Sequence, residues 1–134
     1  MLPEYLIDTN ICIYITKQKP PEVIRKFKKL QVGAVAMSVV NYGELYYGSQ
    51  KSAHAKKAHA ALESLIGVIP VLPLPQDAAK QYGRIRSYLE SKGKIIGNND
   101  LWIAAHCLTL NITLVTNNVK EFKRVPKLRI ENWV

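Results

Sequence analysis

Short apolar runs alternate with longer stretches of helical periodicity along this chain. The apolar runs predict short strands at residues 5–7, 34–37, 68–72, 113–116 and 128–130. Apolar side chains recur at helical spacing, and so predict helices, at residues 9–17, 20–30, 39–48, 53–65, 76–92 and 100–110. Residues 117–122 predict a turn or a short helix, and Pro70 indicates that the third strand is short or lies at an edge.

Strands that alternate with helices predict a parallel sheet with helices on both faces. We therefore expect one domain over residues 1–134, with a three-layer α/β/α architecture and about five short strands. Functional sites of such sheets lie beyond the carboxyl ends of the strands. Asp8 follows the first strand and Asn118 follows the fourth, so both are predicted at the same edge.

Composition supports one folded core and gives no sign of a membrane protein. The chain has 134 residues, of which 48% are hydrophobic, enough for a core without disulfide bonds. Cys12 and Cys107 lie in apolar helical stretches and are predicted to be buried thiols. No apolar run approaches the length of about 18 residues needed to span a bilayer, and the first residues do not resemble a secretion signal, so we expect a cytoplasmic protein.

The charge balance favours a polyanionic partner. Lys and Arg number 19 against 10 Asp and Glu, a formal net charge of +9. The alternative is a well-solvated surface without a polyanion. Basic side chains gather in three clusters, some of which we expect to bind phosphates: residues 25–29, Arg84 with Arg86, and residues 120–129.

Three acids and one amide are the candidate chemistry of the chain. Asp8 ends a strand, Glu44 is a single acid in a mostly apolar helix, and Asp100 lies in the first turn of another. Each has a structural alternative: a helix cap for Asp8, a solvent-facing position for Glu44, and a helix-dipole interaction for Asp100. Asn118 has the alternative of an ordinary turn residue.

Together these residues predict a magnesium site. Gathered carboxylates repel one another by roughly 1 kcal/mol per pair at about 4 Å in water, and by more when partly buried. A divalent cation relieves that repulsion, and Mg²⁺ prefers oxygen ligands and retains several waters. Such an ion activates water and neutralises charge on a phosphodiester, which points to hydrolysis of nucleic acid.

Other catalytic arrangements fit the sequence less well. His54 and His59 are five residues apart, which does not place them on one helix face as zinc ligands. Phosphatases on similar sheets usually carry a second acid two residues after the first, and this chain has Asn10 there. We find neither a serine–histidine–aspartate pattern nor a glycine-rich phosphate loop.

The segments that carry these residues resemble the PIN-domain family, and more narrowly the VapC-type toxins. The likeness runs in order over nearly the whole chain, through residues 8–10, 42–45, 96–106, 114–118, 121–122, 125–126 and 131–133. It implies an endoribonuclease that needs Mg²⁺ or Mn²⁺, with Asp8 and Asp100 as metal ligands and Glu44 completing the site. It also implies a VapB-like antitoxin, a homodimer that assembles further with it, and an RNA substrate such as initiator tRNA.

The chain departs from the family pattern at Asn118, where many members carry a fourth acid. Three carboxylates favour one tightly held metal over two. Glu121 is an alternative occupant of the fourth position, and Asn10 and Thr116 are candidate supporting residues. The loss of one acid also leaves open a competing function, in which a catalytically weakened PIN-like module only binds RNA or protein.

Overall fold

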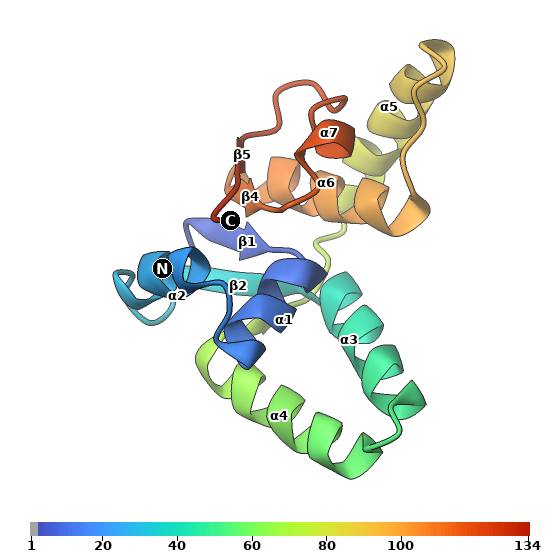
Figure 1. The fold of residues 1–134 in the computed structure, drawn as a ribbon. Coiled ribbons are helices and arrows are strands. Elements are labelled where there is room, and N and C mark those ends of the chain that lie inside the picture. The colour runs from blue at the N-terminus through green and yellow to red at the C-terminus, as the bar shows by residue number, and fades with distance from the viewer. Residues whose placement is uncertain (1–2) are drawn as a thin grey trace.

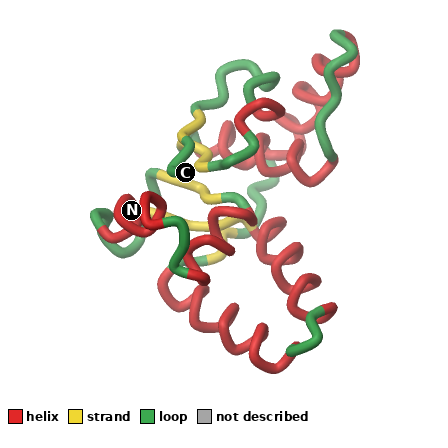
Figure 2. Tube along the Cα trace, in the orientation of Figure 1, coloured by secondary structure: helices red, strands yellow, loops and turns green. Residues whose placement is uncertain are grey.

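The computed structural model describes residues 3–134 and places five parallel strands at the centre of the molecule (Figures 1 and 2). All four strand pairings are parallel, and the strand order is β3-β2-β1-β4-β5. This confirms the predicted parallel sheet. The strands are β1 (Tyr5–Ile7), β2 (Val35–Ser38), β3 (Val71–Leu72), β4 (Thr113–Val115) and β5 (Ile130–Glu131).

Seven helices connect and cover the strands within the described residues. They are α1 (Thr9–Lys17), α2 (Pro21–Lys28), α3 (Val39–Lys51), α4 (Ala55–Val68), α5 (Ala78–Ser91), α6 (Asn98–Leu110) and α7 (Val119–Phe122). In Figure 1, α5, α6 and α7 lie above the sheet, and α3 and α4 extend below it as a helical hairpin.

Alternating strand residues build a core on each face of the sheet, as the pleat of a strand requires. Leu6 and Leu114 pack with α5, α6 and α7, whereas Ile7 and Val115 pack with α1, α2 and α4. All four side chains are buried. The two cores confirm the three-layer arrangement predicted from the alternation of strands and helices.

The prediction that a strand begins at residue 68 is wrong. Helix α4 continues through Val68, and the Ile69 N–H still donates to the Leu65 carbonyl at 2.8 Å. Pairing starts only around Pro70, whose carbonyl accepts from the Met37 N–H, and β3 therefore has two residues. Its place at the end of the sheet confirms the predicted edge position.

Other element ends move for identifiable reasons. Helix α3 continues past Gly48 to Lys51, because Gly48 keeps helical geometry and the Ser49 hydroxyl donates to the Leu45 carbonyl at 3.1 Å. Helix α6 begins two residues earlier than predicted, because Gly97 is its N-cap and its carbonyl accepts from Leu101. The last strand lies at Ile130–Glu131, so it begins two residues later and ends one residue later than predicted.

Two further expectations concern the cysteines and the membrane. Cys12 and Cys107 are buried thiols, as predicted, and burial raises the pKa of both. Between residues 3 and 134, none of the helices combines the length and the apolar character needed to cross a bilayer.

Candidate active site

The candidate site lies beyond the carboxyl ends of β1 and β4, where several helices begin. Asp8 directly follows β1 and caps α1, and its backbone N–H extends the sheet by donating to the Val115 carbonyl at 3.0 Å. Asn118 follows β4 and precedes α7, and Asp100 lies in the first turn of α6. Helix N-termini carry partial positive charge, which favours carboxylates at these positions.

Asp8 is held firmly from two sides. One oxygen accepts from the Ile11 N–H at 3.1 Å and the other accepts from the Thr116 hydroxyl. The Thr116 hydroxyl oxygen in turn accepts from the Asn118 N–H at 2.9 Å. Burial raises the pKa of Asp8, the two hydrogen bonds offset this in part, and the charge of Glu44 raises it further.

Glu44 on α3 accepts hydrogen bonds from two side chains of the site. Its Oε1 accepts from the Thr9 hydroxyl at 2.6 Å, and its Oε2 accepts from the Asn99 amide at 3.2 Å. The Asn41 amide donates to the Thr9 hydroxyl oxygen at 3.2 Å. The sequence interpretation missed Asn41 and Asn99. Asn41 could have been found from its spacing, because residues three apart share a helix face.

Asp100 differs from the other two acids in having no such support. Within residues 3–134, no hydrogen bond or ion pair reaches its carboxylate. Its pKa is raised from 3.8 to about 6, first by burial and then by the charges of Glu121, Glu44 and Asp8. The site therefore holds negative charge that the described part of the chain does not neutralise.

These side chains line one cavity of about 280 Å³, which includes the three acids and the amide proposed from the sequence but neither Thr116 nor Glu121. The lining residues are Asp8, Thr9, Asn10, Asn41, Glu44, Asp100, Ile103, Asn118 and Phe122. No three His, Cys, Asp or Glu side chains in the described chain lie close enough to enclose a metal ion by themselves. A cation here would thus reach some of its partners through water, as Mg²⁺ commonly does.

Asn41 provides an independent test of whether an aquated cation fits. Its Oδ1 is buried and has no hydrogen-bond partner among residues 3–134, although the residue lines the cavity. An unpaired buried acceptor is costly, typically by about 1–3 kcal/mol, and calls for a donor. A water on a bound cation is such a donor, so the oxygen-rich set of ligands and this free acceptor both fit Mg²⁺.

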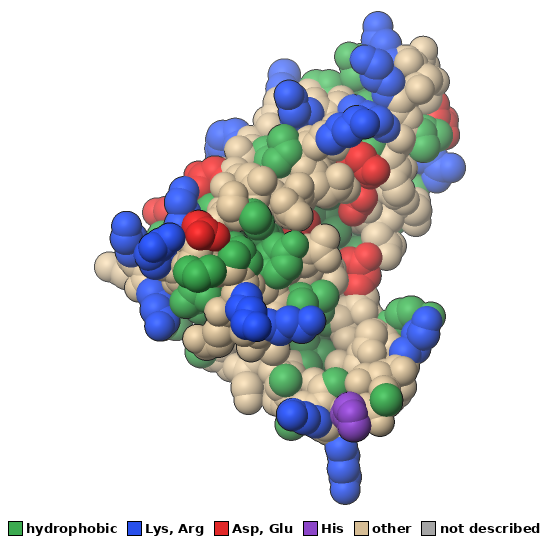
Figure 3. All heavy atoms as spheres, viewed as in Figure 1, with side chains coloured by type: hydrophobic (Ala, Val, Ile, Leu, Met, Phe, Trp, Pro, Cys, Tyr) green, Lys and Arg blue, Asp and Glu red, His purple; other side chains and the backbone are tan. Residues whose placement is uncertain are grey.

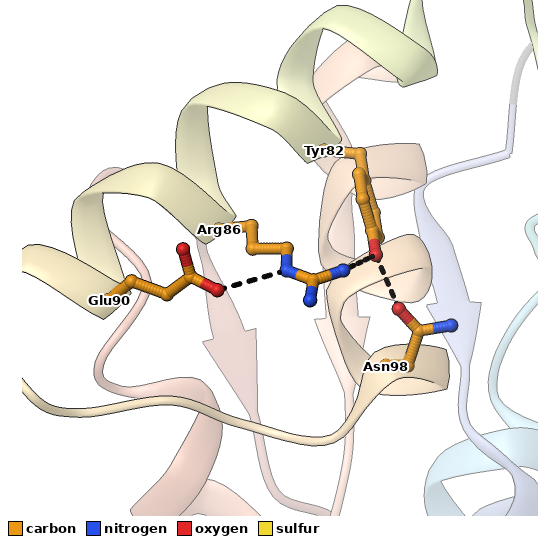
Figure 4. Close-up of polar contacts among 4 residues, drawn as sticks. All are labelled: Tyr82, Arg86, Glu90 and Asn98. Carbon is orange, nitrogen blue, oxygen red and sulfur yellow. Dashed lines mark hydrogen bonds and ion pairs between the residues drawn. The ribbon is translucent and has the colours of Figure 1, made fainter.

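A series of hydrogen bonds between side chains of α5 and Asn98 holds the N-terminus of α6. Asn99 and Asp100 extend into the site from this end of the helix. In Figure 4, Tyr82 and Arg86 point toward Asn98, and Glu90 holds the other end of the Arg86 guanidinium. Arg86 donates to the Tyr82 hydroxyl at 2.8 Å and to Glu90 at 3.2 Å, and the Tyr82 hydroxyl donates to Asn98. Tyr82 also stacks on Trp102 of α6, with ring centroids 4.0 Å apart.

Replacing Asp100 with asparagine is expected to stabilise the metal-free protein at neutral pH. Because folding raises the pKa of Asp100 to about 6, the charged form opposes folding, and the penalty grows as pH rises from about 4 to 6. Solvent screens this half-buried group, so we expect a gain on the order of 1 kcal/mol, or roughly 3 °C in Tm. The measurement is a thermal melt in EDTA at about pH 7.5 and at about pH 4.

The matched control is Asp77→Asn, which removes the same charge from an exposed position that does not line the cavity. It should leave Tm unchanged. Added Mg²⁺ should raise the Tm of the parent and have little effect on Asp100→Asn. A variant that is less stable than the parent in EDTA at neutral pH would contradict the proposed repulsion.

Comparison with known proteins identifies the family. The PIN domain model matches residues 5–128. The chain belongs to the PIN domain family. Ribonuclease VapC2 of Haemophilus influenzae is 39% identical to this PIN domain over 131 residues, covering 98% of both chains. The tRNA(fMet)-specific endonuclease VapC of Shigella flexneri is 38% identical over 130 residues, covering 97% of this chain and 98% of the relative.

Solved structures agree with the sequence relatives and place this PIN domain among the VapC proteins. The crystal structure of DNA-bound VapBC from Salmonella typhimurium superposes with a TM-score of 0.92 at 37% identity, covering all of both chains. VapBC2 from Rickettsia felis, bound to a promoter fragment, gives a TM-score of 0.89 at 38% identity and covers 97% of this chain and 98% of that one. The predicted family and fold are thereby confirmed.

Two residues near the start of α7 are the candidates for the fourth position of this PIN domain: Asn118, which is the N-cap, and Glu121 within the helix. Asn118 lines the cavity, and its side chain makes no capping bond to α7. Glu121 is not in the lining. Its negative charge nevertheless raises the pKa of Asp100 more than the charge of Glu44 or the charge of Asp8 does. Asn118 and Glu121 therefore both stay predictions for the fourth position, the first inside the cavity lining and the second outside it.

Proposed function

We propose that the chain is a Mg²⁺-dependent endoribonuclease, the toxin of a VapBC-type toxin–antitoxin pair. The observation that supports this best is the convergence of Asp8, Glu44 and Asp100 on one cavity, together with the unpaired Asn41 acceptor. The relatives named above as ribonucleases cover nearly the full chain. The formal charge of +9 supports a polyanionic substrate.

Each residue has a distinct part in the proposed reaction. Asp8 and Asp100 would hold the cation, and Glu44, fixed by Thr9 and Asn99, would orient water beside it. When bound, Mg²⁺ would neutralise charge on the phosphodiester and lower the pKa of a water. The rigid support of Asp8 and Glu44 matters because a misplacement of about 1 Å costs on the order of 100-fold in rate.

Transfer RNA is the substrate class we favour. The Shigella flexneri relative is named for its action on tRNA(fMet), and the likeness to it spans nearly the whole of both chains. With Mg²⁺, the purified protein should cleave initiator tRNA at least about tenfold faster than elongator methionine tRNA, and EDTA should abolish both activities. Equal rates on the two tRNAs would contradict the substrate, and cleavage that persists in EDTA would contradict the metal.

The proposed function also implies a protein partner and a cellular location. Several solved relatives are toxin–antitoxin complexes, so we expect a VapB-like antitoxin, a homodimer that assembles further with it, and a place in the cytoplasm. Tyr46 and Tyr47 on α3 are exposed large apolar side chains available to a protein partner. A short neighbouring gene for a DNA-binding antitoxin would support this assignment.

A second candidate function is a binding module without catalysis, favoured by the amide at Asn118 in place of an acid. Glu121 argues against it, because that residue supplies negative charge near Asp100. Calorimetric titration with Mg²⁺ separates the two candidates. A nuclease should bind about one ion in a manner that depends on Asp8, and a pure binding module should show no such heat.

A further inference from the structure

A concave surface made by the end of α5, the loop after it and α7 is strongly basic. It encloses about 670 Å³ and is lined by Tyr88, Lys92, Lys94, Lys120, Lys123 and Arg124, with no acidic residue in the lining. We call it the basic pocket. Figure 3 shows Lys and Arg side chains over the end of α5 and over α7, with acidic side chains directly below those on α7.

The cations of the basic pocket are not neutralised within residues 3–134. Both salt bridges of the described chain lie elsewhere, at Arg25–Glu22 and Arg86–Glu90. Four lysines and one arginine around one hollow repel one another, and the carboxyl end of α5 offers only about half a negative charge. A bound polyanion would relieve this repulsion.

The backbone shapes this pocket locally. Gly93 adopts φ +66°, and the Lys94 N–H returns to the Leu89 carbonyl at 2.9 Å, so the chain turns sharply between Lys92 and Lys94. Arg124 is fixed by a hydrogen bond of 2.9 Å from its guanidinium to the Ile95 carbonyl. The pocket is therefore built by a defined turn and a defined cross-link, and its lysines remain exposed.

Helix α7 joins the basic pocket to the candidate active site. Lys120 and Lys123 line the basic pocket. Between them in the sequence, Phe122 lines the active-site cavity and the charge of Glu121 raises the pKa of Asp100. One helix, roughly 10 Å across with its side chains, thus separates a phosphate-attracting surface from the acidic cavity. A chain held at both places would have to be a polyanion longer than one nucleotide.

We infer that the basic pocket binds the sugar–phosphate backbone of the substrate RNA beside the bond that is cleaved. The inference rests on the proposed ribonuclease function for the identity of the anion. Each lysine that contacts a phosphate displaces condensed counterions, which makes the affinity salt-dependent. The pocket would add binding that is independent of base sequence, because phosphate contacts position a nucleic acid without reading it.

The test measures RNA binding in the Asp8→Asn background, where cleavage does not interfere. The probe is a fluorescein-labelled single-stranded RNA of 20 nucleotides, titrated between 50 and 200 mM salt. A triple variant of the pocket, Lys92→Gln, Lys120→Gln and Lys123→Gln, should flatten the plot of log Kd against log salt by about 2 units, and weaken binding about tenfold at low salt. Arg124 is left in place because it cross-links the loop.

The matched control removes the same charge from exposed lysines on α3 and α4, outside the basic pocket: Lys51→Gln, Lys56→Gln and Lys57→Gln. Each triple variant lowers the formal charge by 3, from +10 to +7 in the Asp8→Asn background of a chain whose own charge is +9. The control should keep the parent slope. Equal salt slopes for the parent and the pocket variant would overturn the inference. Equal flattening by the pocket triple and the control triple would overturn it too, because either result means that the pocket lysines make no specific contacts with RNA phosphates.

A kinetic measurement with the active Asp8 protein separates the pocket from the proposed function. The pocket variant should raise KM about tenfold and leave kcat within about twofold, as expected for loss of uniform binding. If the parent cleaves no RNA while the pocket variant still flattens the salt slope, the ribonuclease proposal fails and the pocket stands. If the parent cleaves RNA and KM is unchanged in the variant, the pocket fails and the ribonuclease stands.

Discussion

Replacing Asp8 with asparagine is expected to lower the rate of RNA cleavage about 10³-fold, which corresponds to roughly 4 kcal/mol of lost transition-state stabilisation. Asp8 is the most deeply buried acid of the site, and its carboxylate faces the cavity from a fixed position. Asparagine keeps the size of the side chain and removes the charge. The proposed cation would then lose its best-ordered ligand.

The fold should survive this change. The asparagine carbonyl oxygen can still accept from the Ile11 N–H, and the Thr116 hydroxyl can rotate to accept from the new amide. Burial of a neutral amide also removes the cost that raises the pKa of Asp8. We therefore expect an unchanged circular dichroism spectrum and a Tm at or above that of the parent in EDTA.

The control for this prediction is again Asp77→Asn, an exposed residue that makes no side-chain capping bond on α5. It should cleave at the parent rate. Single-turnover cleavage of tRNA in saturating Mg²⁺ is the measurement, with Asp100→Asn run in parallel. Rates within tenfold of the parent for both Asp8→Asn and Asp100→Asn would remove the acidic cavity from the mechanism.

Truncating Phe122 to alanine is expected to destabilise the fold by about 3–5 kcal/mol. The side chain is 1% exposed and is the largest among those that are fully buried. It lies on α7, a helix of four residues, and a helix that short is not stable without tertiary packing. Phe122 is the buried residue of α7 and attaches this helix to the core that also contains Leu6 and Leu114.

Thermal and chemical denaturation measure this effect, and we expect Tm to fall by about 10 °C or more. Val32→Ala is the control, because Val32 is 84% exposed and its truncation should change stability by no more than about 0.5 kcal/mol. Phe122→Leu should recover most of the loss. A Phe122→Ala protein as stable as the parent would mean that α7 is held by other contacts.

The sequence predicted the sheet because burial on both faces leaves a strong local signal. The runs around Leu6, Ala36 and Leu114 are short and apolar, which is typical of a strand covered on both faces, and all three residues are fully buried. The start of β3 was not predictable in the same way. Val68 and Ile69 are compatible with either a helix end or a strand. In the structure the Ile69 N–H donates to the Leu65 carbonyl, and this hydrogen bond continues the helix.

In the candidate site, too, some residues could be predicted from the sequence and others could not. Asp8, Glu44 and Asp100 were identified because an acid within an apolar segment is conspicuous, and the structure brings them to one cavity. Asn41 and Asn99 were missed because their role is to hold Glu44 and Thr9, and polar residues near a helix start have many uses. The relation of Glu121 to Asp100 depends on the orientation of α7, which no local pattern specifies.

Helix α7 contributes side chains to both the basic pocket and the active-site cavity, and this restricts insertions and deletions in the segment around it. Surface segments usually tolerate insertions, and α7 with its flanking turns is such a segment. One residue inserted at the start of α7 would move each following side chain by about 100° around the helix, so that Lys120 would take the place of Glu121 beside Asp100 and Glu121 would take the buried place of Phe122. Homologues that preserve both surfaces should therefore vary in loop length before Asn118 or after Arg124, and keep the spacing between these residues constant.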